Sequence, residues 1–301
     1  MNIDKFSETL VNELRKELGE STTIIVNPVM RNNNNVLLGL HICDGNNKIA
    51  PVIYLEELYD RFKAGDLTMK EIAKKIIEIN NTPTDVQKCF MLEEFLSWEK
   101  AKKNIEMRLI NQSMNEKLLE DVPWIPQQDL AVVFCYCKYD VDNSAAYSIF
   151  LHNHHMAEWN VTVKELLEAG LQNFSYDDVV ILSITDLLGE LGEEFKIPIP
   201  EIDESDINMY VLTNKRRQYG ATAIVHTEIL QEFSAKHGNK DILILPSSIH
   251  EQILIPLNGD EDMSEYKQMI QDVNSTQLST DILSDHAYIY RKVDNEIQSV
   301  L

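Results

Sequence analysis

The chain has 301 residues, of which 44% are hydrophobic and 25% are charged. This composition is typical of a soluble globular protein with one large domain or two ordinary ones, and it excludes a disordered chain. The 49 acidic and 27 basic side chains give a formal net charge of −22. A field of that sign repels phosphate backbones and anionic membrane surfaces, so we expect neither direct nucleic-acid binding nor membrane binding. It instead suits a basic protein partner.

The N-terminus and the cysteines predict a cytoplasmic protein. The first 19 residues are amphipathic and mixed in charge, without the apolar core of a signal peptide. No apolar run approaches the roughly 20 residues that a membrane-spanning helix needs. Cys135 and Cys137 share one face of an expected strand and are placed to chelate a soft metal, but no second pair at zinc-site spacing accompanies them. We therefore expect reduced, buried thiols and no cofactor.

Residues 1–122 combine helices with a strand hairpin. Apolar residues recur at helical spacing from Phe6 to Leu18, and the asparagine-rich segment 31–35 favours a turn between two strands. Thr68 and Glu71 have the spacing of a capping box. The expected elements are a helix at 3–18, strands at 22–29, 36–42 and 49–54, helices at 55–64, 68–79 and 86–103, a strand at 107–111 and a helix at 114–122.

The proline-rich stretch 123–128 is a candidate boundary, so we divide the chain into subdomains 1–122 and 123–301. Residues 186–206 hold eight acidic side chains against one lysine and suggest a solvated linker or lid. The expected elements are strands at 129–139 and 145–152, helices at 161–171 and 182–191, strands at 209–213 and 220–225, a helix at 228–236, strands within 242–257, a helix at 263–273, and strands at 286–291 and 296–300.

The order strand, turn, strand, helix recurs near residues 22–79, 129–171 and 242–273, without the residue identities of a true repeat. It predicts an α+β fold with mixed or antiparallel sheets and helices packed on one face. In the strand at 129–139, alternation predicts one aromatic face and one small, thiol-bearing face.

The segment 242–257 is the most chemically loaded part of the chain. Two apolar runs, typical of strands buried on both faces, flank the polar insert 246–252. A hydrolase would use Ser248 as nucleophile, His250 as base and Glu251 to orient it, but adjacent residues of an extended chain point in opposite directions. The favoured interpretation is a turn in which the proline and serines shape the backbone.

Two other clusters have candidate roles. His152 and His154 could chelate a divalent metal from one strand face, although a strand end with exposed imidazoles is the favoured interpretation. Lys215, Arg216 and Arg217 could clamp a phosphate or carboxylate, or pair with the acidic segment 186–206, which is the simpler alternative.

Several stretches resemble an uncharacterised bacterial family, the domain of unknown function 5688. The similar residues are Tyr210–Asn214, Arg217, Gly220, Ala221, Leu245–Glu251, Val52–Leu55 and Asn274–Gln277, with the early hairpin. The resemblance covers nearly the whole chain and implies a stand-alone protein of Gram-positive anaerobes, some copies of which are carried on mobile elements. It implies no activity, cofactor or catalytic residue.

Two functions remain open from the sequence. The favoured one is a non-enzymatic acidic protein that binds or regulates a basic partner through protein–protein contacts. The alternative is a metal-assisted or nucleophilic hydrolase that uses the residues of the insert, together with the histidines at 152 and 154. The sequence leaves the oligomeric state undefined.

Overall fold

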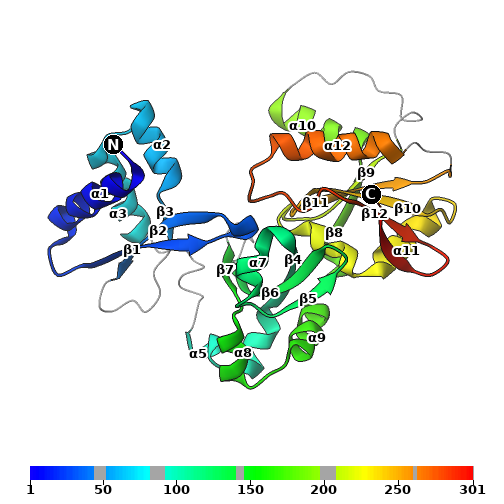
Figure 1. The fold of residues 1–301 in the computed structure, drawn as a ribbon, viewed down its shortest axis with the longest axis horizontal. Helices are drawn as coiled ribbons and strands as arrows, with labels where there is room; N and C mark the ends of the chain where they lie inside the picture. Colours follow the sequence, from blue (N-terminus) through cyan, green and yellow to red (C-terminus); the bar gives the residue numbers. More distant parts are fainter. Residues whose placement is uncertain (44–51, 82–91, 140–145, 197–207, 260–262, 301) are drawn as a thin grey trace. The chain divides into compact units, whose positions relative to one another are not determined.

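The computed structural model describes residues 1–43, 52–81, 92–139, 146–196, 208–259 and 263–300. The fold is α+β with antiparallel sheets, as the sequence predicts (Figure 1). Contacts divide the chain into two compact units. Unit 1 comprises Met1–Met91 with Lys138–Tyr147, and unit 2 comprises Leu92–Cys137 with Ser148–Leu301. Within the described ranges, no helix is long and apolar enough to cross a membrane.

Unit 1 packs three helices against one face of a three-stranded sheet with the order β1-β2-β3. Alternate strand residues, including Leu40 and Ile42, meet Phe6, Leu10 and the other apolar residues of the helices in one core. The elements are α1 (Ile3–Leu18), β1 (Thr23–Met30), β2 (Val36–Cys43), β3 (Ile53–Tyr54), α2 (Glu56–Ala64) and α3 (Met69–Asn81).

Local sequence signals explain how these elements begin and turn. Asn33 and Asn34 adopt left-handed φ angles of 58° and 52° between β1 and β2, which asparagine tolerates better than most residues. The backbone N–H of Glu71 donates to Thr68 Oγ1, and that of Thr68 donates to the Glu71 carboxylate, so the expected capping box at α3 is present. Part of the third predicted strand lies outside the described residues.

One sheet of unit 2 is built on β6, which pairs with β4, β5 and β7. Its two faces differ as predicted, because Phe134 and Tyr136 alternate with Cys135 and Cys137, all four being buried. The proline-rich residues 123–128 contribute β5, which pairs with β6 inside this unit. The strands are β4 (Ile105–Asn111), β5 (Trp124–Gln127), β6 (Leu130–Tyr139) and β7 (Ala146–Phe150).

The second sheet of unit 2 has six strands in the order β13-β12-β10-β11-β9-β8. Helix α12 (Met263–Thr276) covers one face, where Ile270 packs with Leu243, Leu245 and Ile289 (Figure 1). The strands are β8 (Val179–Ser183), β9 (Tyr210–Asn214), β10 (Ile242–Ser248), β11 (Glu251–Pro256), β12 (Ala287–Arg291) and β13 (Glu296–Val300).

The predicted strand pair within 242–257 is confirmed as β10 and β11, central to this sheet. Ile242, Leu243, Ile244 and Leu245 are all at most 2% exposed, as expected for a strand buried on both faces. The register shifts between Pro246 and Ser248, where a bulge leads into the turn.

Several predicted elements are wrong in detail. Residues 220–225 form the 3-10 helix η5, not a strand, because the chain enters it through Tyr219 at a φ of 55°. The described part of 86–103 holds two short helices and a 3-10 turn in place of one helix. The helix predicted at 182–191 forms at 184–195, so the first part of the predicted linker 186–206 is helical, and residues 197–206 lie outside the described residues. These elements are α5 (Leu92–Phe95), α6 (Trp98–Ala101), η2 (Lys102–Asn104), η5 (Gly220–Val225) and α10 (Ile184–Phe195).

The sequence did not predict helix α8 or strand β8. Leu166 of α9 is fully buried, and that helix begins with the expected capping box between Thr162 and Glu165. The elements are η1 (Asn32–Asn34), η3 (Ser113–Asn115), α7 (Glu116–Leu119), α8 (Asn153–Trp159), α9 (Val163–Asn173), η4 (Tyr176–Asp178) and α11 (Thr227–Lys236).

Candidate functional site

The polar insert between β10 and β11 uses its side chains to shape the turn. Ser248 Oγ accepts the His250 backbone N–H at 3.0 Å, and Ser247 Oγ donates to Glu251 Oε1 at 3.1 Å. Gln277 also donates to the Ser247 carbonyl. Both hydroxyls therefore have local partners, and neither hydrogen-bonds to the His250 ring among the contacts of the described residues.

The His250 ring positions a neighbouring loop. Its Nδ1 accepts the backbone N–H of Tyr219 at 3.1 Å, so in the neutral ring the proton is on Nε2, which lies 3.9 Å from Asp281 Oδ1. A general base must offer an unprotonated nitrogen to the substrate, and this tautomer offers none. The geometry favours a positioning role for His250.

The loop that His250 holds is packed closely against the turn. Gly220 leaves no room for a Cβ, which would lie 2.6 Å from the Asn214 backbone nitrogen and 2.8 Å from the His250 carbonyl oxygen. Thr213 Oγ1 donates to the same carbonyl at 2.9 Å. The stretches of sequence that resemble the family, 210–221 and 245–251, thus form one packed junction.

The three histidines at 152, 154 and 155 lie at the start of α8, so the predicted strand end is wrong. The His152 backbone N–H donates to His155 Nδ1 at 3.0 Å, and His152 Nδ1 lies 2.8 Å from Asp121 Oδ2. Burial, with the neighbouring His154 and His152, lowers the pKa of His155 to about 4. A neutral His155 therefore accepts the cap hydrogen bond that allows the helix to begin here.

Each of the three predicted anion-binding cations has a carboxylate nearby. Lys215 Nζ lies 3.8 Å from Asp178, Arg216 lies 3.6 Å from Glu106, and Arg217 lies 2.5 Å from Glu190. The partner of Arg217 belongs to the acidic segment 186–206, which is the simpler alternative that the sequence offered. Separate carboxylates hold the three cations, and these contacts do not bring them together around one anion.

A buried arginine that sequence reasoning missed lies beneath this loop. Arg108 is 5% exposed, and its guanidinium lies 3.7 Å from the centre of the Tyr219 ring and 3.6 Å from Cys137 Sγ. Burial raises the pKa of Cys137 well above its ordinary value, although Arg108 acts in the opposite direction. Cys137 therefore remains a thiol, which makes it a poor nucleophile.

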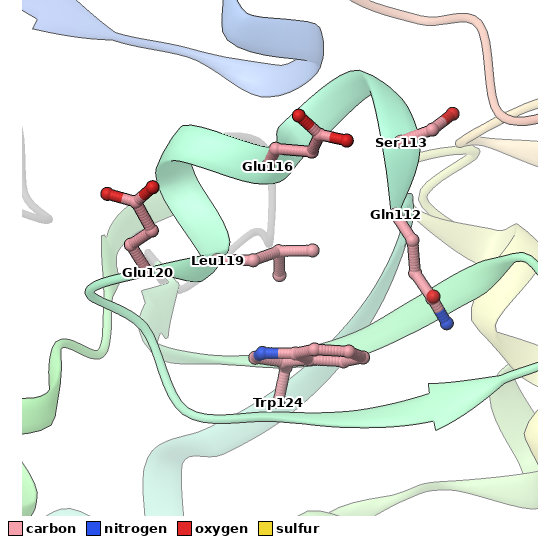
Figure 2. Close-up of a pocket in the computed structure, with 6 residues that line it drawn as sticks. All are labelled: Gln112, Ser113, Glu116, Leu119, Glu120 and Trp124. Carbon is pink, nitrogen blue, oxygen red and sulfur yellow. The ribbon is translucent and has the colours of Figure 1, made fainter.

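A hollow of about 420 Å³ lies on unit 2, between α7 and β5. Figure 2 shows Leu119 directed toward the Trp124 ring, while the carboxylates of Glu116 and Glu120 point away from it. Gln112 and Ser113 complete the lining. Trp124 and Leu119 are half-buried, whereas both glutamates are exposed. The hollow thus has an apolar, aromatic floor and an acidic rim.

The floor of the hollow is held by the sheet below it. Trp124 begins β5, whose pairing with β6 fixes its backbone opposite Val133. Gln112 Nε2 donates to the carbonyl oxygens of Leu130 at 2.6 Å and of Gln128 at 3.1 Å. An aromatic floor with exposed carboxylates at its rim is suited to a cation, which the ring face and the carboxylates both attract.

The local sequence around this hollow carries only a weak signal of a binding site. Trp124 falls within the proline-rich stretch 123–128, and Glu116 and Glu120 fall within the helix expected at 114–122. A single tryptophan between two prolines that is not part of an apolar stripe is the one local sign of an aromatic surface site.

Comparison with known proteins places the chain in a family. A family model described as a family of unknown function, DUF5688, matches residues 3–292. The chain belongs to the DUF5688 family. No curated protein and no solved structure matches this DUF5688 chain.

Proposed function

We propose that this protein is a non-enzymatic binding protein that captures a basic segment of a partner protein in the hollow between α7 and β5. The observation that carries the proposal is the combination of the Trp124 ring with the exposed carboxylates of Glu116 and Glu120 around one hollow of about 420 Å³. That volume falls in the range of ligand sites, and a lysine or arginine side chain would bring its cation to the ring while its apolar stem packs on Leu119.

The charge of the whole chain supports the same partner chemistry. A net charge of −22 attracts a basic partner over distances of a Debye length and raises the association rate at low ionic strength. We place this binding in the cytoplasm, with support from the free thiols of Cys43, Cys135 and Cys137.

The hydrolase alternative has less support. It needs Ser248, His250 and Glu251 to act in series, but Ser248 accepts a backbone N–H and His250 Nδ1 is occupied by Tyr219. Glu251 accepts from Ser247, and among the hydrogen bonds of the described residues none joins it to the histidine ring that it would orient. No specific geometric observation favours hydrolysis over binding.

The test is fluorescence anisotropy of a labelled peptide of alternating arginine and glycine, titrated with the full chain. The double variant Glu116→Gln/Glu120→Gln should lower the affinity about tenfold, since two exposed ion pairs each contribute about 0.2–1 kcal/mol. Trp124→Leu should lower it severalfold, and this loss should persist in about 0.5 M salt because ring contacts are screened less than exposed ion pairs.

The matched control is Glu8→Gln/Glu17→Gln, which removes the same charge from exposed positions on α1. It should leave the affinity within about twofold of the unchanged chain, because it reduces only the long-range attraction of the net charge and leaves the hollow intact. An equal loss in both double variants, or an unchanged affinity in Trp124→Leu, would contradict the proposal.

A further inference from the structure

Three potential metal ligands from distant parts of the sequence converge on one point of unit 2. Asp129 lies in the turn between β5 and β6, whereas Asp285 and His286 directly precede β12. His286 Nδ1 lies 3.2 Å from Asp129 Oδ2 and 3.0 Å from Asp285 Oδ1. The three ligand atoms all lie within 4.8 Å of one another. An imidazole nitrogen and two carboxylate oxygens are a donor set that divalent transition metals accept.

The Asp129 carboxylate is held in place by buried groups beneath it. The Tyr288 hydroxyl donates to Oδ1 at 2.7 Å, and the Ser284 hydroxyl donates to Oδ2 at 2.7 Å. Tyr288 is 1% exposed and Ser284 is fully buried. Such supporting hydrogen bonds orient the carboxylates of metal sites and leave lone pairs for the ion. The backbone is fixed as well, because the Asp129 carbonyl accepts the Gln112 N–H at 2.9 Å.

The two distances from the imidazole nitrogen fit a coordination sphere. Ligand atoms bonded at about 2.1 Å and separated by about 90–100° lie about 3.0–3.2 Å apart. The two distances from His286 Nδ1 fall in this range. A proton on His286 Nδ1 cannot point at both carboxylate oxygens at once, so it cannot make a well-aligned hydrogen bond to both aspartates. A cation between the three atoms interacts with both carboxylates together.

The outer side of the cluster is open to solvent. The Asp285 side chain is 65% exposed and the His286 side chain is 43% exposed, whereas that of Asp129 is 28% exposed. An ion can therefore reach the three atoms from water, and water molecules can complete its coordination. Mg²⁺ and Ca²⁺ prefer sites of six or more oxygens, so this nitrogen-containing set favours ions such as Zn²⁺ and Mn²⁺.

We propose that Asp129, Asp285 and His286 form a binding site for a divalent transition metal ion, with Zn²⁺ or Mn²⁺ as occupant. The ion would join the β5–β6 turn of one sheet to the segment that leads into β12 of the other, so binding stabilises unit 2. This proposal stands apart from the capture of a basic partner and does not depend on it.

The test is isothermal titration of the full chain, purified without a histidine tag and freed of metal, with Zn²⁺ and separately with Mn²⁺. We expect one ion of at least one of the two metals per chain, and that metal should raise the unfolding temperature, since a ligand that binds only the folded state stabilises it. His286→Gln and Asp285→Asn should each weaken binding at least tenfold. Asp285 is exposed and His286 is half-buried, and each replacement is close in size to the native side chain, so the variants should retain the fold.

The matched control is His152→Gln/His154→Gln, which removes two imidazoles at the start of α8. This variant should bind the metal as the unchanged chain does. Two results would overturn the proposal: no binding of either ion at micromolar concentrations, or binding that is lost in the control variant and retained in His286→Gln.

Discussion

At the scale of single residues, histidines that resemble catalytic or metal-binding residues in the sequence accept hydrogen bonds from the backbone. His250 accepts the N–H of Tyr219, and His155 accepts that of His152. A serine and a histidine at adjacent positions suggest catalysis in a sequence, but the sequence does not show whether a backbone donor has already taken the lone pair. Residue types predicted a polar turn within 246–252, and the structure confines that turn to residues 249–250 between β10 and β11. The role of the His250 ring depended on a loop about 30 residues earlier.

The role of His250 can be measured with two substitutions. His250→Ala removes the acceptor of the Tyr219 N–H and should lower the free energy of unfolding by about 1–3 kcal/mol, because a half-buried donor loses its partner. His250→Asn retains an acceptor oxygen near the position of Nδ1 and should lose less. Urea denaturation of both variants checks this, and equal losses would argue that the ring acts by packing.

At the scale of elements, the sequence predicted secondary structure well where hydrophobic periodicity is strong. It predicted secondary structure poorly where close tertiary packing determines the backbone path. The helix at 3–18 and the hairpin that follows formed as expected, because apolar spacing and turn residues there agree with the tertiary contacts. Residues 220–225 have the composition of a strand, yet they form η5. The close approach of Gly220 to the His250 carbonyl fixes this path, and that contact joins two segments 30 residues apart.

Alanine substitutions at two glycines should change the free energy of unfolding in opposite directions, and the packed position tests this explanation. Gly220→Ala should lower the free energy of unfolding by about 1–3 kcal/mol, because its Cβ would overlap backbone atoms that cannot move freely. Gly189→Ala, within helix α10, meets nothing within 4 Å and should raise stability by about 0.5–1 kcal/mol through helix propensity. Thermal or urea unfolding distinguishes the two, and a neutral Gly220→Ala would show that the loop can relax.

At the scale of the whole molecule, the dominant feature is the excess of acidic groups. With a net charge of −22, the acidic side chains repel one another more strongly in the compact folded state than in the expanded unfolded chain. Several ion pairs of the described residues, such as Lys63 with Asp60, are exposed and offset little of this repulsion. Stability should therefore depend on ionic strength.

The expected outcome is a higher urea midpoint in about 150 mM sodium chloride than in about 10 mM, because the Debye length falls from roughly 30 Å to 8 Å and screens the repulsion. Potassium chloride should act equally, since screening does not distinguish the two cations. The Glu8→Gln/Glu17→Gln variant, with less charge, should show a smaller increase. A midpoint that falls with salt would indicate that attractive pairs outweigh the repulsion.

The sequence by itself determined the fold class, the main helices and hairpins, the two faces of β6 and the acidic field, since each depends on neighbours along the chain or on composition. Only the tertiary structure decided which polar groups meet. Arg108 lies under Tyr219, Trp124 faces α7, and Asp129 lies beside His286, 157 residues later. Such contacts depend on how the elements pack in three dimensions, and no local periodicity encodes that arrangement.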